Sequence, residues 1–363
     1  MFDVDPNTIN LFSKYIKGEN FHVIWIDPLF EKNMSDVKKA LGKDRAKILI
    51  VNHEPNYYYP KHNVAQQFIE LKNILLDYQI FNCDFYITCY MSDNCHNDTI
   101  NYLNENFYDW KFHKFCIDIP LMSNWTLNVL DTLDINNESL YLEECKNKFC
   151  HLNYTHRMHR QLFSKFLIKE NLVKNNLISI NDGVHLTSEK LNYPKKVLGK
   201  PFHYRSDWFY SKKLLDLWRE VPLEFNKHPD TEKGNGLPFL KFIHKASINI
   251  ISETVFDYPY PYYTEKTVQA ILSKRPFICI GSAGNLQNLK EKGFKTFASE
   301  FNEDYDTMTD PNQRLEAIMQ LVLELNKKSQ QELIDMCNNM EDTLIHNYKL
   351  MLQKIKHFTN SPN

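Results

Sequence analysis

Short apolar segments alternate with helical stretches in the first part of the chain. Four segments rich in β-branched and aromatic residues cover 21–27, 46–55, 83–90 and 115–120, and this composition is typical of strands. Between two of them, the apolar residues of 64–77 recur at helical spacing and share one side. Strands that alternate with helices predict a parallel sheet joined by crossover helices.

A second series of the same kind begins near residue 149. The segment KFCHLNYTH is expected as a strand or a linker, and 183–236 as irregular chain with several Pro and Trp residues. The remaining expected elements are the helix RMHRQLFSKFLIKENL, the strand LISIND, the strand ASINIISE, the helix TEKTVQAILSK, the strand RPFICIGS, the helix NLQNLKEKG, and C-terminal helices in PNQRLEAIMQLVLELNK and from residue 330 onward.

These two series predict an α/β protein with two Rossmann-like domains. With 363 residues the chain has room for both. We expect an N-terminal domain over 1–145, a C-terminal domain over 146–335, and a terminal helix over 336–363 that crosses back to the first domain or pairs with another chain. Two such sheets facing a cleft bind ligands beyond the carboxyl ends of their strands. The ends to inspect are NHEP, SETVFDYPYPYYTEK and GSAG.

Composition and charge narrow the function classes. The formal net charge of −2 lacks the basic excess of most nucleic-acid binders, so we expect no nucleic-acid partner. No apolar run reaches the length of a membrane span, and the N-terminus has no signal pattern. The eight cysteines are scattered without zinc spacing. The expected location is the cytoplasm, or the host cytoplasm for a viral protein.

The stretch YYTEKTVQAILSK predicts a helix that opens at Thr264. Thr264 is a good N-cap, and the free N–H groups behind it make a helix start an anion site. Lys266 stands in the first turn, where a positive charge opposes the helix dipole. A bound diphosphate would resolve this conflict, and Glu265 could accept hydrogen bonds from ribose hydroxyls. The alternative is a capped surface helix with a solvated Glu–Lys pair.

Two further segments carry candidate chemistry. Arg157 and Arg160 lie one turn apart at a helix start, where two guanidiniums can clamp phosphate oxygens; the alternative is a solvated basic turn. His53 and Glu54 follow a buried strand, and either is a candidate general base, unless this is only a polar loop. Asp304 and Asp306 form an Asp-x-Asp pair, but we expect no metal site there.

The segment ISETVFDYPYPYYTEKTVQAILSKRPFICIG resembles the donor-binding motif of the α-1,3-fucosyltransferases. The upstream KNKFCHLNYTHRMHRQLFSKFL is similar to that family's Lys-Phe-Cys segment, which leads into an arginine at a helix start. Thr254 and Val255 depart from the family's Asn and Ser. SKRPFICIGSAGNLQNLKEKGFKTF also resembles glycosyltransferase-like proteins of phages and giant viruses.

The resemblance implies a two-domain glycosyltransferase of the GT-B type. By match, the donor-binding residues are Arg160, Glu253, Tyr262, Glu265 and Lys266; the residues themselves add Arg157 and Thr264. The implied reaction needs no metal or other cofactor and inverts the sugar. Its partners are a nucleotide-sugar, with GDP-fucose as leading candidate, and a carbohydrate or glycoconjugate acceptor. Glu54 is the general base by position, with His53 as the alternative. Two other readings stay open: a DNA-base-modifying sugar transferase and a non-catalytic nucleotide-sugar-binding protein.

Overall fold

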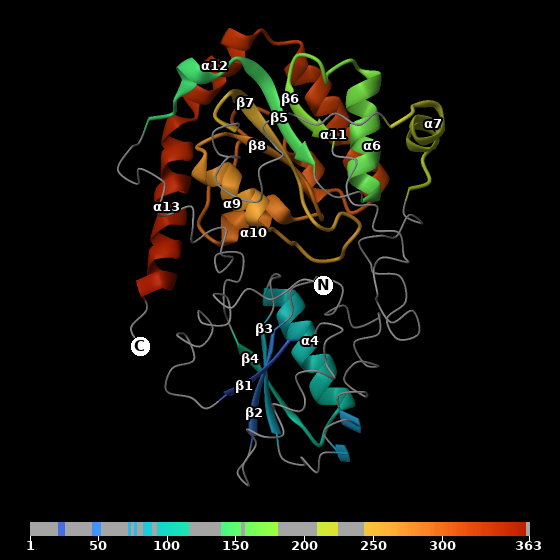
Figure 1. Cartoon of the computed structure of the whole chain (residues 1–363), viewed down its shortest axis with the longest axis vertical. Helices are drawn as coiled ribbons and strands as arrows, with labels where there is room; N and C mark the ends of the chain where they lie inside the picture. The colour runs from blue at the N-terminus through green and yellow to red at the C-terminus, as the bar shows by residue number, and fades with distance from the viewer. Residues whose placement is uncertain are drawn as a thin grey trace. The chain divides into compact units, whose positions relative to one another are not determined.

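The protein is an α/β protein with two parallel sheets (Figure 1). The computed structural model describes residues 21–25, 46–51, 72–73, 76–77, 83–88, 93–115, 139–153, 157–180, 209–223 and 243–360. The chain divides into two compact units. The first holds 1–119, 188–202 and 361–363, and the second holds 120–187 and 203–360.

The first unit contains a sheet of four described strands in the order β1 (Phe21–Trp25), β2 (Ala46–Val51), β3 (Cys83–Thr88) and β4 (Lys111–Phe115), all parallel. The first three match the expected strands. The expected fourth strand was 115–120, but β4 begins four residues earlier. It includes Phe112 and the residues that alternate with it.

Helix α4 (Asp93–Asn106) was not expected from the sequence. It leads back to β4, and among its residues 97–106, whose burial is described, Thr99 and Leu103 are buried. Such a narrow apolar contact leaves little periodic signal. Beside it Phe85 stacks on Trp110, with ring centroids 4.4 Å apart. This aromatic packing gives the first unit its described core.

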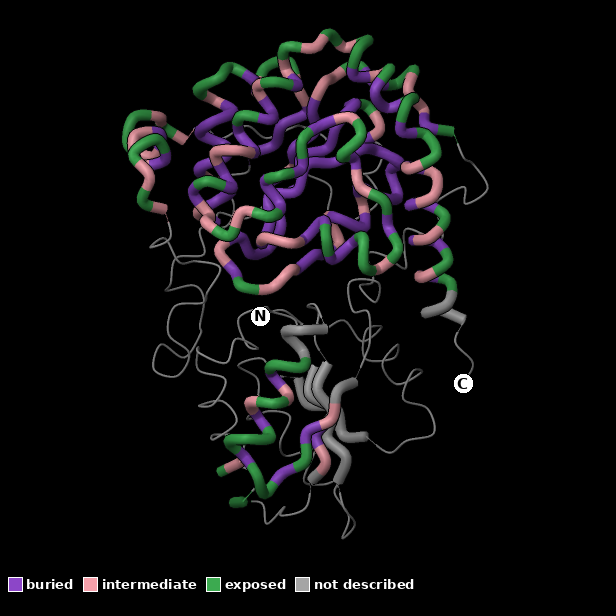
Figure 2. The backbone as a smooth tube through the Cα atoms, turned by 180° about the vertical axis from the view of Figure 1, so that it is seen from behind, coloured by how far each residue is buried: buried purple, intermediate pink, exposed green. Residues whose placement is uncertain are grey.

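The second unit contains a sheet in the order β6-β5-β7-β8, again all parallel. Its strands are β5 (Asn147–Asn153), β6 (Leu177–Ile180), β7 (Ala246–Ser252) and β8 (Phe277–Ile280). Every residue of β6, β7 and β8 is buried (Figure 2), as expected for parallel strands covered on both faces. Residues 148–153 of the segment KFCHLNYTH belong to β5, so this part is a strand rather than a linker, and 154–156 lie outside the described residues.

Helices cover both sides of this second sheet. Figure 1 shows α9 (Glu265–Leu272) with α13 (Glu341–Asn360) on one side, and α6 (Met158–Lys169) with α11 (Pro311–Asn326) on the other. The other helices are α7 (Lys212–Glu220), α10 (Asn285–Glu291) and α12 (Gln330–Asn339). α7 lies inside the segment expected to be irregular, and Lys165 of α6 donates to Trp218 O at 2.8 Å.

The turn GSAG connects β8 to α10, as the sequence indicates. The close approach at Gly281 is internal, because a Cβ there would lie 2.2 Å from the Asn285 amide nitrogen. That amide bonds Tyr262 in both directions: Tyr262 N donates to its oxygen at 2.6 Å, and its nitrogen donates to Tyr262 O at 2.9 Å. Gly281 thus lets Asn285 fix the chain just before α9.

We predict that Gly281→Ala destabilises the protein by about 1–3 kcal/mol, the usual cost of overpacking a core. Chemical denaturation of single and double variants measures the effect. In an Asn285→Ala background the contact with the amide is removed and only Cys279 Sγ, at 3.1 Å, stays close, so the same change should cost less. Equal costs in both backgrounds would contradict the contact.

Candidate functional site

The second sheet reverses its winding direction between β5 and β7. From β5 the chain crosses to β6 on one side, and from β7 it crosses to β8 on the other. Beyond the carboxyl ends of two such strands lies the crevice where open α/β sheets bind ligands. The two segments that leave this point begin α6 and α9, and seven of the expected site residues lie on them.

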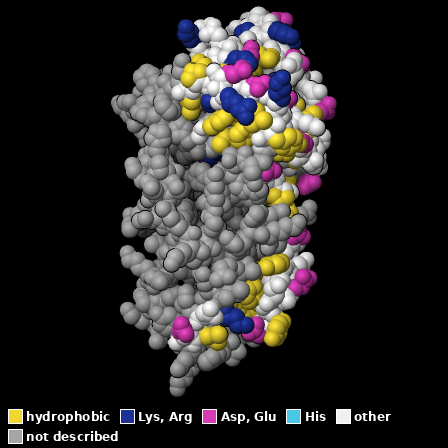
Figure 3. Space-filling model, turned by 90° about the vertical axis from the view of Figure 1, so that its right-hand side faces the viewer, with side chains coloured by type: hydrophobic (Ala, Val, Ile, Leu, Met, Phe, Trp, Pro, Cys, Tyr) yellow, Lys and Arg dark blue, Asp and Glu magenta, His cyan; other side chains and the backbone are white. Residues whose placement is uncertain are grey.

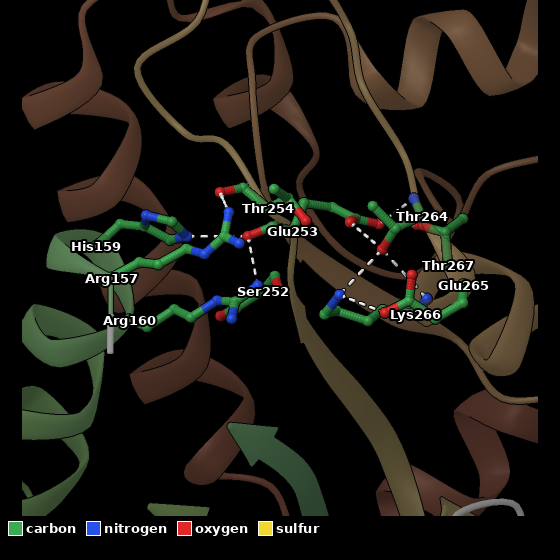
Figure 4. A network of polar contacts seen from close by, with 10 residues as sticks. All are labelled: Arg157, His159, Arg160, Ser252, Glu253, Thr254, Thr264, Glu265, Lys266 and Thr267. Carbon is green, nitrogen blue, oxygen red and sulfur yellow. Dashed lines mark hydrogen bonds and ion pairs between the residues drawn. The ribbon is translucent and has the colours of Figure 1, made fainter. Parts of the chain in front are cut away.

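Glu253 is the centre of the contacts at this edge (Figure 4). It directly follows β7 and is fully buried. One carboxylate oxygen accepts from Thr264 N at 3.0 Å and from Thr267 Oγ1 at 2.6 Å, and the other accepts from Thr264 Oγ1 at 2.6 Å. A buried charge needs such donors. Glu253 therefore ties the end of β7 to the first turn of α9.

The start of α9 confirms the expected cap. Thr264 Oγ1 accepts from Lys266 N at 3.3 Å, and the helix buries Val268, Ile271 and Leu272. Lys266 Nζ lies 2.7 Å from Glu265 Oε1 and 3.2 Å from Thr264 Oγ1. The charge of Lys266 is thus met by a neighbouring carboxylate, as in the alternative of a capped helix with a Glu–Lys pair.

The Glu265 carboxyl responds to this neighbour. Burial acts to raise its pKa, but the charge and hydrogen bond of Lys266, a backbone hydrogen bond and the charge of Arg160 together hold the pKa below its ordinary value. Glu265 is therefore ionised at neutral pH. With Glu253, it brings negative charge to the positive end of α9, where the helix dipole favours it.

The start of α6 reaches the same segment from the other side. Figure 4 shows Arg157, His159 and Arg160 directed at the chain of Ser252–Thr254. Arg160 donates to Ser252 O and Glu253 O, both at 2.9 Å, His159 Nε2 donates to Glu253 O at 3.0 Å, and Arg157 donates to Thr254 O. Arg157 and Arg160 are 8% and 3% exposed, so the alternative of a solvated basic turn is wrong.

The start of α6 carries two basic side chains, Arg157 and Arg160. The side chain of its N-cap, Arg157, makes no capping hydrogen bond, and the first turn holds no acidic residue. Free N–H groups, the helix dipole and two guanidiniums all favour an anion at such a position. Here α6 differs from α9, whose start already holds a carboxylate from the protein itself.

His159 and His151 are both neutral at this edge. Burial lowers the pKa of His159 well below its ordinary value, and the nearby charge of Arg160 lowers it further. Burial likewise lowers the pKa of His151 to about 4. The ring of His159 also stacks on Phe256, with centroids 5.4 Å apart. Protonation of either ring would place a charge in the core.

Several expected site residues stay separate from this network or outside the description. Tyr262 is buried next to α9, held by Asn285. His53 and Glu54, the candidate bases, lie outside the described residues. Asp306 caps α10 by accepting from Leu286 N at 2.9 Å and Gln287 N at 3.0 Å. Among the described residues there is no cluster of three metal-ligating side chains.

Three residues of the site were missed in the sequence. Thr267 and His159 contact Glu253, and Asn285 fixes Tyr262. Thr267 had a usable signal, because it stands three residues after the cap Thr264 and near the start of the same helix. The others depend on contacts between distant segments, such as the pairing of α6 with the end of β7.

Three further observations concern the surface charge, membrane spans and similarity to known proteins. On the face in Figure 3, basic and acidic side chains of the described residues are interspersed rather than gathered in a basic stripe. In the described part of the chain, no helix has the length and apolar character needed to cross a bilayer. No protein-family model matches the chain, and neither does any curated protein.

We predict that Glu253→Gln destabilises the protein by about 1–3 kcal/mol, because an amide nitrogen would face a hydrogen-bond donor in a buried site. Thr267→Val removes one of the same bonds and should cost about 1–2 kcal/mol. Urea denaturation of both single variants and the double variant measures the coupling. Additive costs would show that Glu253 and Thr267 do not act as one unit.

The neutral histidines make stability fall in mild acid. In the folded protein, the pKa values of His151 and His159 lie below 6.5, the ordinary value of a histidine in the unfolded chain. The stability that these two neutral histidines contribute is fully present above pH 6.5. It is lost as the pH falls from 6.5 toward their pKa values in the folded protein. Between pH 6.5 and 5.5, each of the two histidines should lower the free energy of unfolding by about 1 kcal/mol.

Replacement of His159 by Gln should remove about 1 kcal/mol of this pH dependence, since Gln can donate to Glu253 O without titrating. The free energy of unfolding at pH 6.5 and 5.5 gives the comparison. If wild type and His159→Gln lose equal stability over this interval, His159 is not held neutral by the fold.

Proposed function

We propose that the protein is a glycosyltransferase that uses a nucleoside-diphosphate sugar. The observation that carries the proposal is the buried basic start of α6 at the reversal point of a parallel sheet. Arg157 and Arg160 stand there together with an uncapped helix start. A diphosphate is the ligand whose charge and shape suit two guanidiniums and free N–H groups. Two α/β units with parallel sheets also agree with a GT-B architecture.

In this proposal each expected donor residue has a separate task. Arg157, Arg160 and the N–H groups of α6 hold the diphosphate, and Lys266 adds a positive charge from α9. Tyr262 and Glu265 also bind the nucleoside diphosphate, as the family resemblance implies. Glu253 and Thr264 act by positioning α9, because both oxygens of the Glu253 carboxylate accept bonds from within the protein.

The reaction follows from these charges. A hydroxyl oxygen of the acceptor forms a bond to the anomeric carbon while the bond from that carbon to the diphosphate oxygen breaks. The acceptor proton passes to a carboxylate base, for which Glu54 is the candidate and His53 the alternative. The diphosphate leaves with the electron pair, and the cations at the helix starts stabilise the growing charge. GDP-fucose is the leading donor.

A nucleotide screen tests the proposal. Melting temperatures are measured with GDP, UDP, CMP and dTDP and with their sugar-linked forms, and each binder is then assayed for sugar release. One nucleotide should stabilise the protein by about 2.7 kcal/mol at a concentration 100 times its dissociation constant. If none of the three diphosphates raises the melting temperature, or if only CMP does, the proposal fails.

Lys266→Ala should weaken binding of that nucleotide about 10- to 100-fold, the usual loss for one charge-assisted contact. The matched control is Lys327→Ala. Lys327 is exposed at the end of α11, near the amino edge of the sheet, where Lys148 of β5 donates to Asn326 O at 2.6 Å. Isothermal calorimetry compares the two variants. Equal affinities would remove Lys266 from the site.

A further inference from the structure

Three side chains form a polar row across the carboxyl edge of the second sheet: His151, Asn153 and Ser252. Asn153 ends β5 and Ser252 ends β7. These strands pair with Cys150 opposite Asn249, so the same register places Asn153 opposite Ser252. His151 precedes Asn153 by two residues and thus points to the same face.

The polar row faces α6 rather than α9. The ring of His151 meets Phe163 of α6 edge-on, with centroids 5.2 Å apart. The Asn153 amide nitrogen lies 3.5 Å from Ser164 Oγ of the same helix. Arg160 of α6 donates to the carbonyl of Ser252. The row therefore lies beside the basic start of α6, where the diphosphate is proposed to bind.

One polar atom of each side chain in the row is buried without a hydrogen-bond partner. These atoms are His151 Nε2, Asn153 Oδ1 and Ser252 Oγ, and Ser282 Oγ just beyond β8 is a fourth. A buried polar atom without a partner costs stability and is rare in folded proteins. Four of them at the carboxyl ends of three adjacent strands, β5, β7 and β8, indicate groups that a ligand completes.

The chemistry of the atoms defines that ligand. His151 Nδ1 donates to Ile250 O at 2.9 Å, and burial lowers the pKa of the ring to about 4. Its Nε2 is therefore a neutral acceptor at pH 7. Asn153 Oδ1 is also an acceptor, and the serine hydroxyls donate or accept. Acceptors of this kind bind donors such as hydroxyl groups and disfavour phosphate oxygens.

We propose that the polar row binds the hydroxyl groups of a sugar ring. This inference rests on the proposed function and extends it. The start of α6 takes the charged diphosphate, and the row beside it takes a neutral polyhydroxyl part of the same nucleotide-sugar. That part is either the ribose or the transferred sugar, and both present the same chemistry.

Ser252→Ala tests the row through two readings. Without ligand, loss of an unpartnered hydroxyl should raise the melting temperature by about 2 °C. With ligand, it should weaken binding about tenfold, the value of one hydrogen bond. The matched control is Ser247→Ala on the same strand. The Ser247 hydroxyl accepts from Gln330 Nε2 at 2.8 Å, so its loss should lower the melting temperature and leave affinity unchanged.

The probes are GDP with GDP-fucose and UDP with UDP-glucose. Weaker binding of the sugar-linked form alone assigns the row to the transferred sugar, and equal weakening of both forms assigns it to the ribose. Unchanged affinity in Ser252→Ala, while wild type binds a probe, overturns the row and leaves the proposed function standing. A fall in melting temperature like that of Ser247→Ala also overturns it. A wild type that binds only dTDP is tested with dTDP and dTDP-glucose in the same way. If wild type binds no nucleoside diphosphate, the proposed function fails, and the row fails with it.

Discussion

The bonds between Glu253 and the first turn of α9 are the interaction on which the site depends. A fully buried carboxylate accepts from a backbone N–H and two threonine hydroxyls, and such charge-assisted bonds are among the stronger ones in proteins. They hold the end of β7 against α9. The carbonyl of the same residue accepts from His159 and Arg160 of α6. One residue thus joins the two helix starts that border the reversal point of the sheet.

The starts of α6 and α9 differ in the charged side chains that lie at them. At α9 the positive dipole end meets Glu253 and Glu265, and Lys266 is paired with Glu265. At α6 the dipole end meets Arg157 and Arg160, whose described bonds go to backbone carbonyls. Carbonyl groups carry no formal charge, and the first turn of α6 holds no acidic residue, which supports the proposal of an anion site at α6. The sequence suggested phosphate contacts at both helix starts, and this difference in charge favours α6 as the proposed diphosphate site.

Much of the fold was predictable because the decisive signals are local. β7 is a continuous apolar run, and Thr264 stands where a helix cap is required, so both were found from the pattern. α4 was missed because few side chains are buried among its residues 97–106. α7 was missed because it has only nine residues and lies within a segment rich in Pro and Trp. β4 was placed too late, since the apolar residues after Phe115 resemble a strand more than KFHKF does.

The residues of the candidate site could be predicted from the sequence, but the contacts that each of them makes could not. The arginines and the TEK sequence were identified, yet their partners belong to distant segments. Glu253 is 14 residues from Thr267 and Arg160 is 92 residues from Ser252. No local pattern reports such pairs, and the buried atoms of the polar row have no sequence signal at all. Packing of α6 and α9 around the end of β7 decides these contacts.

Amide chemical shifts on addition of a nucleoside diphosphate test the central claim most directly. The account predicts that the largest changes fall on the first turn of α6, at Met158, His159 and Arg160, with smaller ones at Lys266. Amides at the amino edge, such as Ser247, should not move. Saturable binding with the largest changes away from both helix starts, or no saturable change at all, would contradict an anion site at the reversal point of this sheet.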